Sequence, residues 1–340
     1  MREVNVMLVH ATIVLGSLIL ILVSSAFFTN AVEWLGIRLG VREGAVGSLL
    51  AALGTAMPEI LIPLVAILTG TKGGSGPAIG IGAILGAPFM LSTAALAMAG
   101  ASGLLFARRR GTGHLYPDPR PIRRDLGFFL VAWTLVIGST FVPRSLRLAL
   151  PPLLLAAYMG FVYVVLSRGR QMDGHKMSAL FFAPWSDLPP MGVILLQLIL
   201  AFAGITFGVR YFVTFIESLA GFLKLPVLLF SLLVAPLASE SPELFNSVLW
   251  IGQKKDTLAL GNITGAMVLQ SSVAPVVGLA FTPWVLPPAA LVSALLTLLA
   301  AGSAYLFVSR RGYLSGAFLL AVGGIFYLSF LGVVIGSSGY

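Results

Sequence analysis

The chain has no cysteine and little charge. Without cysteine among its 340 residues, it has neither disulfide bonds nor thiolate metal sites. Only 10% of the residues are charged, whereas soluble domains carry about a quarter. Hydrophobic residues make up 58%, and the mean hydropathy is +1.00. This composition excludes a soluble globular protein and indicates a polytopic membrane protein.

Acidic residues are also fewer than basic ones. The 12 Asp and Glu against 21 Lys and Arg give a net charge of +9. In a membrane protein such an excess is typical of inside loops that lie beside anionic lipid. We therefore expect membrane lipid, and no nucleic acid, as the partner of these basic residues.

Long apolar runs make up most of the chain and divide it into ten segments, each long enough to cross a bilayer. The loops between them are short, which predicts one compact bundle of ten transmembrane helices. The first segment has no clear cleavage signal and is interpreted as a retained span. The segments lie near residues 6–30, 43–70, 76–106, 125–142, 148–167, 190–213, 225–251, 256–281, 285–309 and 314–336.

The basic residues predict the orientation of these spans. With the N-terminus outside, all but six of the 21 Lys and Arg fall in or beside inside loops. The six exceptions are Arg2, Lys72, Arg144, Arg147, Arg210 and Lys224. We expect both termini outside, and the compact form without a regulatory domain favours a prokaryotic plasma membrane.

Two Pro-Glu pairs interrupt apolar segments, one in each half of the chain. They lie in residues 54–59 (GTAMPE) and 238–243 (ASESPE). A carboxylate at bilayer depth is costly and therefore indicates a functional site. Proline breaks a helix, which lipid tolerates only where protein or a water-lined cavity surrounds the break.

The two halves also resemble each other. An offset of 184 residues aligns Glu59 with Glu243 and Glu33 with Glu217, and residues 82–87 (GAILGA) resemble 261–266 (GNITGA). Five spans separate the copies, so the copies lie in opposite orientation. The sequence thus predicts inverted five-helix repeats over 1–167 and 190–340, joined by a cytoplasmic linker over 168–189, with broken helices at the midplane.

Oxygen atoms dominate the candidate site. Glu59, Glu240 and Glu243 are the acidic residues deep in apolar segments, and unwound backbone near 52–55 and 235–238 is expected to expose carbonyl oxygens. Further oxygen ligands are expected from Thr55, Ser239 and Gln270. Ca²⁺ takes six to eight such oxygens, so it fits better than zinc or copper. The alternative is that each Glu is a protonated packing residue.

Glycines follow each Pro-Glu helix at a spacing of four. Gly82 and Gly86 form one small-xxx-small pattern, and Gly261 and Gly265 form the other. Such patterns let helices approach closely, so each is expected to pack against the preceding Pro-Glu helix.

These motifs resemble the α-repeats of the cation/Ca²⁺ antiporter superfamily, which includes the Na⁺/Ca²⁺ exchangers. The family pattern is Gly-Thr-Ser-x-Pro-Glu followed by Gly-Asn-x-x-Gly-Ser-x-x-x-Asn/Asp, here within about 43–106 and 225–281. Several positions depart from it: Ala56, Ala83, Ala87, Leu91, Glu240, Ala266 and Gln270. The resemblance implies ten spans in inverted repeats, with Glu59 and Glu243 as central cation ligands.

The resulting hypothesis is a secondary active antiporter that exchanges Ca²⁺ for Na⁺ or H⁺ by alternating access. The cations are cargo, and we expect no resident cofactor and no catalytic residue. One alternative is a non-transporting homologue that binds a cation structurally or as a sensor. A weaker one is a membrane enzyme that hydrolyses lipid phosphate or peptide bonds, suggested only by residues 100–103 (GASG). The sequence does not indicate an oligomeric state.

Overall fold

The computed structural model describes residues 2–39, 57–69, 75–168 and 178–336, and this part of the chain is almost entirely helical. Membrane spans satisfy their backbone hydrogen bonds internally, which favours helices for so apolar a chain. The helices and the two short strands are α1 (Arg2–Arg38), α4 (Met57–Thr69), α5 (Gly76–Met90), the π-helical turn η2 (Leu91–Ala95), α6 (Leu96–Leu105), α7 (Ala107–Arg110), β1 (His114–Leu115), α8 (Pro119–Gly138), the 3₁₀ turn η3 (Ser139–Phe141), α9 (Arg144–Arg147), α10 (Leu150–Arg168), α11 (Met191–Phe222), α12 (Val227–Ser239), α13 (Ser241–Gly252), α14 (Asp256–Ser272), α15 (Ala274–Phe281), α16 (Pro288–Arg311), β2 (Leu314–Ser315) and α17 (Gly316–Gly336).

Every predicted apolar segment coincides, wholly or in part, with one of these helices. Among the described residues, 8 helical stretches are long and apolar enough to cross a membrane. The other two predicted segments contain the shorter apolar helices Glu59–Leu68 and Val227–Leu237. The helical membrane architecture is therefore confirmed, while the number of ten spans remains a prediction.

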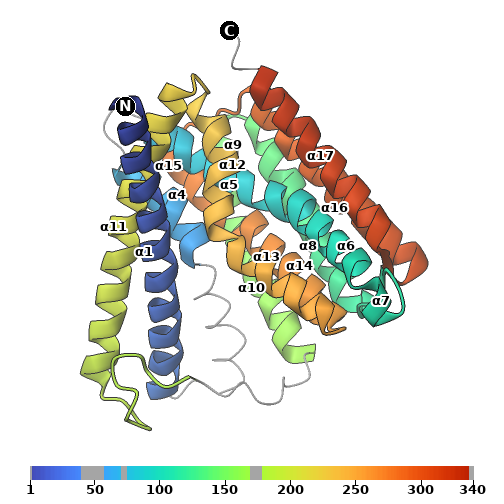
Figure 1. Ribbon diagram of the computed structural model, residues 1–340, viewed down its shortest axis with the longest axis horizontal. Coiled ribbons are helices and arrows are strands. Elements are labelled where there is room, and N and C mark those ends of the chain that lie inside the picture. Colours follow the sequence, from blue (N-terminus) through green and yellow to red (C-terminus); the bar gives the residue numbers. More distant parts are fainter. Residues whose placement is uncertain (1, 40–56, 70–74, 169–177, 337–340) are drawn as a thin grey trace.

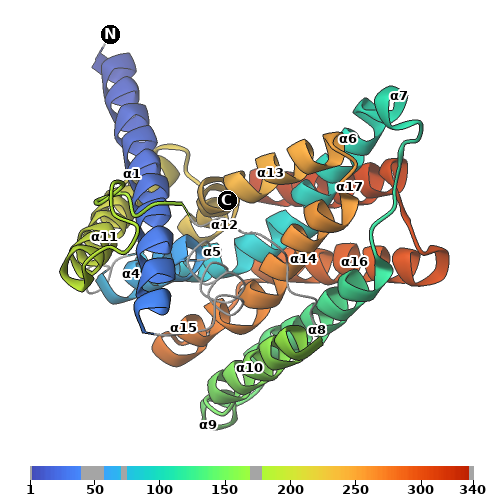
Figure 2. The same cartoon turned by 90° about the horizontal axis from the view of Figure 1, so that it is seen from below.

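The helices form two groups that differ in packing. The long helices α1 and α11 lie side by side at one edge, and α6, α8, α16 and α17 lie toward the other (Figures 1 and 2). Between them, α5 is buried over almost its whole length and packs against α4 and α12. The largest buried side chains, Trp133, Trp284 and Phe89, belong to the core on the α8 and α16 side of α5.

The beginning of α1 and the end of α17 lie on the same side of the molecule (Figure 1). On the opposite side, β1 pairs antiparallel with β2. Nearby, the buried guanidinium of Arg110 donates to both carboxylate oxygens of Asp256, at 2.8 and 2.7 Å. Asp256 also accepts from the backbone N–H of Tyr116 at 2.7 Å. This ion pair joins the connection before α8 to the first residue of α14.

The glycine pattern of α5 allows a close approach between the two halves of the chain. A Cβ added at Gly82 would lie 2.5 Å from the carbonyl oxygen of Leu228, and one at Gly86 would overlap that of Leu232. Both carbonyls belong to α12, and Ser231 on the same helix donates to the carbonyl of Ile79 at 2.9 Å. The expectation that this pattern packs on the preceding helix is corrected: it packs on α12.

The second glycine pattern behaves differently. An added Cβ at Gly261 or Gly265 meets no atom of the described residues within 4 Å. The packing predicted for this pair is thus not seen within the described part of the chain.

The helix breaks fall close to the prolines. The helix from Val227 ends at Ser239, Glu240 lies between α12 and α13, and Pro242 is in the first turn of α13. The predicted unwinding over 235–238 is wrong, because the helix continues to Ser239 and the N–H of Glu240 still donates to the carbonyl of Pro236 at 2.8 Å. The corresponding residues 52–55 lie outside the described residues.

Two further helices depart from regular α geometry close to a proline. Pro88 is followed by the π-helical turn η2, and α14 gives way to α15 at Val273, with Pro275 in the first turn of α15. Local π-helical turns are frequent at functional sites. Leu91, the first residue of η2, corresponds to Gln270 by the 179-residue offset between the glycine motifs.

Candidate cation site

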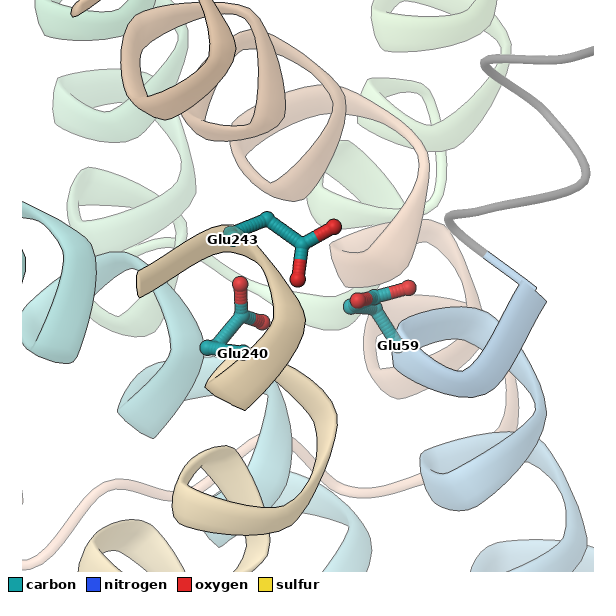
Figure 3. A group of neighbouring side chains, drawn as sticks. All are labelled: Glu59, Glu240 and Glu243. Carbon is teal, nitrogen blue, oxygen red and sulfur yellow. The ribbon is translucent and has the colours of Figure 1, made fainter. Parts of the chain in front are cut away.

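Three glutamates from both halves of the chain converge at the middle of the bundle. Glu59 comes from α4, Glu240 from the break between α12 and α13, and Glu243 from the first turn of α13. One carboxylate oxygen of each lies within 4.8 Å of the others, and the carboxylates point toward one another (Figure 3). Carboxylates this close repel one another unless a cation or protons lie between them.

The surroundings of the three carboxylates make the repulsion stronger. Glu240 is fully buried, Glu59 is 8% exposed and Glu243 is half-buried. Little water therefore reaches them, and low dielectric increases the Coulomb energy between like charges. The N-terminus of α13 offsets a part of this cost for Glu243, because a carboxylate in the first turn of a helix faces the positive end of its dipole.

Gln270 and Ser239 hold one oxygen of Glu240. The amide nitrogen of Gln270 donates to Oε1 of Glu240 at 2.7 Å, and the hydroxyl of Ser239 donates to the same oxygen at 3.3 Å. Gln270 is itself buried on α14. These two bonds fix the Glu240 carboxylate and leave its second oxygen available.

Several oxygens at the site have no hydrogen-bond partner among the described residues. They are Oε2 of Glu59, Oε2 of Glu240, Oε2 of Glu243 and Oε1 of Gln270. Buried polar atoms are nearly always satisfied, so acceptors gathered in this number are suited to bind a cation, protons or water. The donor set is oxygen throughout, which suits hard cations such as Ca²⁺.

Of the residues predicted for the site, the structure brings five together. Glu59, Glu240 and Glu243 form the cluster, and Ser239 and Gln270 join it through Glu240. Thr55 lies outside the described residues. The role of these residues as cation ligands remains a prediction.

Sequence reasoning missed two buried acidic residues, Asp125 and the Asp256 that pairs with Arg110. Asp125 on α8 is 4% exposed, accepts from the Nε and Nη2 atoms of Arg124 at 3.0 and 2.8 Å, and accepts from the hydroxyl of Thr264 at 3.1 Å. Thr264 lies in the glycine motif of α14, the helix that carries Gln270. The only sequence hint was that Thr264 lies within the glycine motif, and no sequence pattern pairs Thr264 with Asp125.

The serine of the hydrolase-like string does not lie at the glutamate cluster. The Ser102 hydroxyl donates to the carbonyl of Met98 in its own helix at 2.7 Å. It borders a largely apolar groove that is lined by Met98, Ala101, Ser102, Leu104, Leu105 and Leu320. This environment does not activate a nucleophile.

Comparison with known proteins connects this geometry to one family. A family model described as sodium/calcium exchanger protein matches residues 9–167 and 193–338, which together form most of the chain. Among curated protein sequences, none matches.

The fold is also similar to those of several solved structures, two of which are exchangers. The H⁺/Ca²⁺ exchanger CAX is 19% identical with a TM-score of 0.72, over 95% of this chain and 82% of that one. Native YfkE is 17% identical with a TM-score of 0.63, over 95% and 92%. The sodium-calcium exchanger NCX_Mj is 19% identical with a TM-score of 0.56, over 95% and 99%. At these identities the likeness is one of fold.

Proposed function

Because the chain belongs to the sodium/calcium exchanger protein family and is a cation/Ca²⁺ antiporter, not an enzyme, we propose that it exchanges Ca²⁺ for protons at the three-glutamate cluster. The observation that carries this proposal is the convergence of Glu59, Glu240 and Glu243, each with an oxygen that has no hydrogen-bond partner among the described residues. These oxygens and Oε1 of Gln270 would coordinate Ca²⁺, and water would complete the coordination shell.

Charge balance supports exchange at a single site. Three carboxylates in a buried cluster need positive charge in every state that crosses the low-dielectric middle of the membrane. Ca²⁺ supplies two charges and protons supply the remainder, or protons alone neutralise the cluster. Ca²⁺ and protons therefore compete for the same oxygens, and release of one accompanies binding of the other.

The substitutions in the family pattern favour protons over Na⁺ as the counter-ion. The resemblance implies that Na⁺ sites use Ser and Asn oxygens, and four such positions carry Ala56, Ala87, Leu91 and Ala266. A carboxylate, Glu240, occupies the position of another serine hydroxyl. The chain has thus lost neutral oxygen ligands and gained a group that carries a proton.

For the architecture we propose ten spans in two inverted repeats, with both termini outside a prokaryotic plasma membrane. The two shorter apolar helices would complete the ten, and α1 and α11 would slide across the central helices to open the site to one side at a time. The shared side of the beginning of α1 and the end of α17 supports an even number of spans (Figure 1).

Radioactive Ca²⁺ uptake into proteoliposomes tests the proposal. One set of vesicles carries an outward H⁺ gradient and a second set an outward Na⁺ gradient. We expect uptake under the H⁺ gradient, abolished by a protonophore. Uptake only under the Na⁺ gradient would show that the counter-ion is Na⁺ and not the proton. No uptake under either gradient would favour a non-transporting homologue.

A further inference from the structure

Asp125 is a buried acidic residue within a membrane span but outside the glutamate cluster. It lies on α8, in the candidate span Pro119–Phe141, and its side chain is 4% exposed. An ionisable side chain buried in a membrane span is costly, so it indicates a functional site by default. Asp125 is therefore a second candidate for binding an ion or a proton.

The counter-charge of Asp125 is more exposed than that of the other buried aspartate. Asp256 is held through both of its oxygens by the buried guanidinium of Arg110. In contrast, Oδ1 of Asp125 alone accepts from Nε and Nη2 of Arg124, at 3.0 and 2.8 Å. The Arg124 side chain is 38% exposed. Water thus reaches the guanidinium of this pair, whereas the carboxylate is almost fully buried.

The second oxygen of Asp125 connects α8 to the helix that carries Gln270. Oδ2 accepts from the hydroxyl of Thr264 on α14 at 3.1 Å, and Thr264 is itself buried. A hydroxyl group donates to an ionised carboxylate but accepts from a protonated carboxyl group. The contact between α8 and α14 therefore suits both protonation states of Asp125.

The helices packed around α8 bring no further charge to Asp125. These helices are α14, α16 and α10, and their charged residues lie at helix ends: Asp256, Arg310, Arg311 and Arg168. Beside the pair lie aromatic rings. The Phe161 ring is 5.1 Å from Cζ of Arg124, and the rings of Tyr158 and Tyr305 also pack near α8. In the described part of the chain, Arg124 is thus the group that balances an ionised Asp125.

Asp125 lies at a depth between one face of the molecule and the glutamate cluster. Both α8 and α14 begin on the side opposite to the beginning of α1, which is the inside face in the proposed topology (Figure 1). Thr264 is about 12 Å along α14 from Asp256, its first residue, at 1.5 Å per residue. Gln270, which bonds to Glu240, is about 9 Å farther along the same helix. The charge of the Asp125 pair is therefore about 10 Å from the cluster.

We propose that Asp125 is a second proton-binding site, which lowers the Ca²⁺ affinity of the glutamate cluster when a proton from the inside binds to it. This inference rests on the proposed exchange of Ca²⁺ for protons. While Asp125 is ionised, its pair with Arg124 has no net charge. Once Asp125 is protonated, the charge of Arg124 is unbalanced and repels a cation at the cluster. A unit charge about 10 Å away, partly screened by water, weakens cation binding about threefold to tenfold.

Calorimetric titration of Ca²⁺ into Asp125→Asn tests the effect of charge. The amide keeps an oxygen acceptor and resembles the protonated side chain, so we expect Kd to rise about threefold to tenfold at neutral pH. An unchanged Kd would overturn the proposal. Asp118→Asn is the matched control on the same helix, because Asp118 is exposed and accepts from the N–H of Arg120, which an Asn cap also provides for. In this control Kd should stay within about twofold of the wild type.

Two further variants separate charge from hydrogen bonding. Arg124→Gln combined with Asp125→Asn removes both charges, and we expect Kd to return to within about twofold of the wild type. A Kd that stays as high as in Asp125→Asn alone would show that packing, and not charge, causes the loss. Thr264→Val removes the hydroxyl but no charge, so it should leave Kd within about twofold of the wild type. A rise equal to that in Asp125→Asn would likewise contradict the proposal.

Infrared difference spectroscopy detects the bound proton itself. On acidification of the Ca²⁺-free protein, we expect the wild type to gain the C=O stretch of one more protonated carboxyl group than Asp125→Asn gains. Identical spectra would show that Asp125 binds no proton. Neither the spectra nor the titrations require transport. Absent Ca²⁺ uptake by the wild type would therefore contradict the proposed function, whereas normal uptake with unchanged spectra and Kd in Asp125→Asn would contradict only the second proton site.

Discussion

The amide nitrogen of Gln270 lies 2.7 Å from Oε1 of Glu240, and both side chains are buried. This bond connects α14 to the break between α12 and α13. It places Oε1 of Gln270, which has no hydrogen-bond partner in the described part of the chain, beside the carboxylate cluster. An amide therefore both orients one glutamate and offers a neutral oxygen of its own.

Replacing Gln270 by Leu removes both contributions. We expect Ca²⁺ affinity to fall about tenfold, because a buried hydrogen bond to a charged group contributes about 1.5–3 kcal/mol. Calorimetric titration of Ca²⁺ measures the change. Gln270→Glu restores an oxygen ligand but not the donor, so a loss equal to that of Gln270→Leu identifies the donated bond as the important contribution.

Neutralising Glu59 or Glu243 is expected to abolish exchange. In Glu59→Gln and Glu243→Gln, the cluster loses a charged ligand, and Ca²⁺ uptake should fall at least about a hundredfold. Glu217→Gln on α11 is the matched control, since Glu217 is half-buried and not in the cluster. Uptake that stays at the wild-type level in either site variant would show that the cation binds elsewhere.

Glu240→Ser restores the hydroxyl of the family pattern and removes one proton-binding group. Lower pH should weaken Ca²⁺ binding in the wild type, because protons and Ca²⁺ compete for the same oxygens. We expect the pH dependence to become shallower in Glu240→Ser, and Na⁺ to become the better driving ion. The measurement is Ca²⁺ uptake at several pH values under each gradient, and an unaltered slope would exclude Glu240 as a proton carrier.

The two glycine motifs should differ in their tolerance of alanine. Gly86→Ala places a methyl group against the backbone of α12, and we expect a loss of about 1–3 kcal/mol in the free energy of unfolding. Gly261→Ala and Gly265→Ala meet no described atom within 4 Å and should be neutral, or stabilising by up to about 1 kcal/mol. Thermal unfolding in detergent measures the stability of the three variants. Equal effects would contradict the difference in packing between the two glycine motifs.

The buried ion pair of Arg110 and Asp256 should matter more for stability than for ion binding. Arg110→Ala leaves a buried carboxylate unpaired, which typically costs about 3–5 kcal/mol. The exposed neighbour Arg109 provides the control, because Arg109→Ala removes a solvated charge. The midpoint temperature of thermal unfolding should fall only in Arg110→Ala, while the Ca²⁺ affinity of the folded fraction stays unchanged.

Much of the site was predictable because each Pro-Glu pair is rare in an apolar segment and appears once in each half. The same pattern did not give the position of the helix break. Pro236 lacks an N–H but its carbonyl still accepts from Glu240, so the helix continues to Ser239. Pro242 lies in the first turn of α13, where its missing N–H removes no helical hydrogen bond.

Other contacts carry no sequence signal because they join residues far apart in the chain. The Asn30 and Gln197 amides are 167 residues apart, and Asp125 and Thr264 are 139 apart. Likewise, small residues at a spacing of four indicate that a helix packs closely but not against which partner. That choice depends on how the two halves meet, and in α5 the partner is α12.

Calorimetric titration of Ca²⁺ in buffers of different ionisation enthalpy tests the central claim most directly, because it measures ion binding and proton release together. For the wild-type protein we predict Ca²⁺ binding with proton release to the buffer. For the double variant that carries both Glu59→Gln and Glu243→Gln, we predict no Ca²⁺ binding and no proton release. Ca²⁺ binding that persists in the double variant, or wild-type binding without proton release, would contradict exchange of Ca²⁺ for protons at the glutamate cluster.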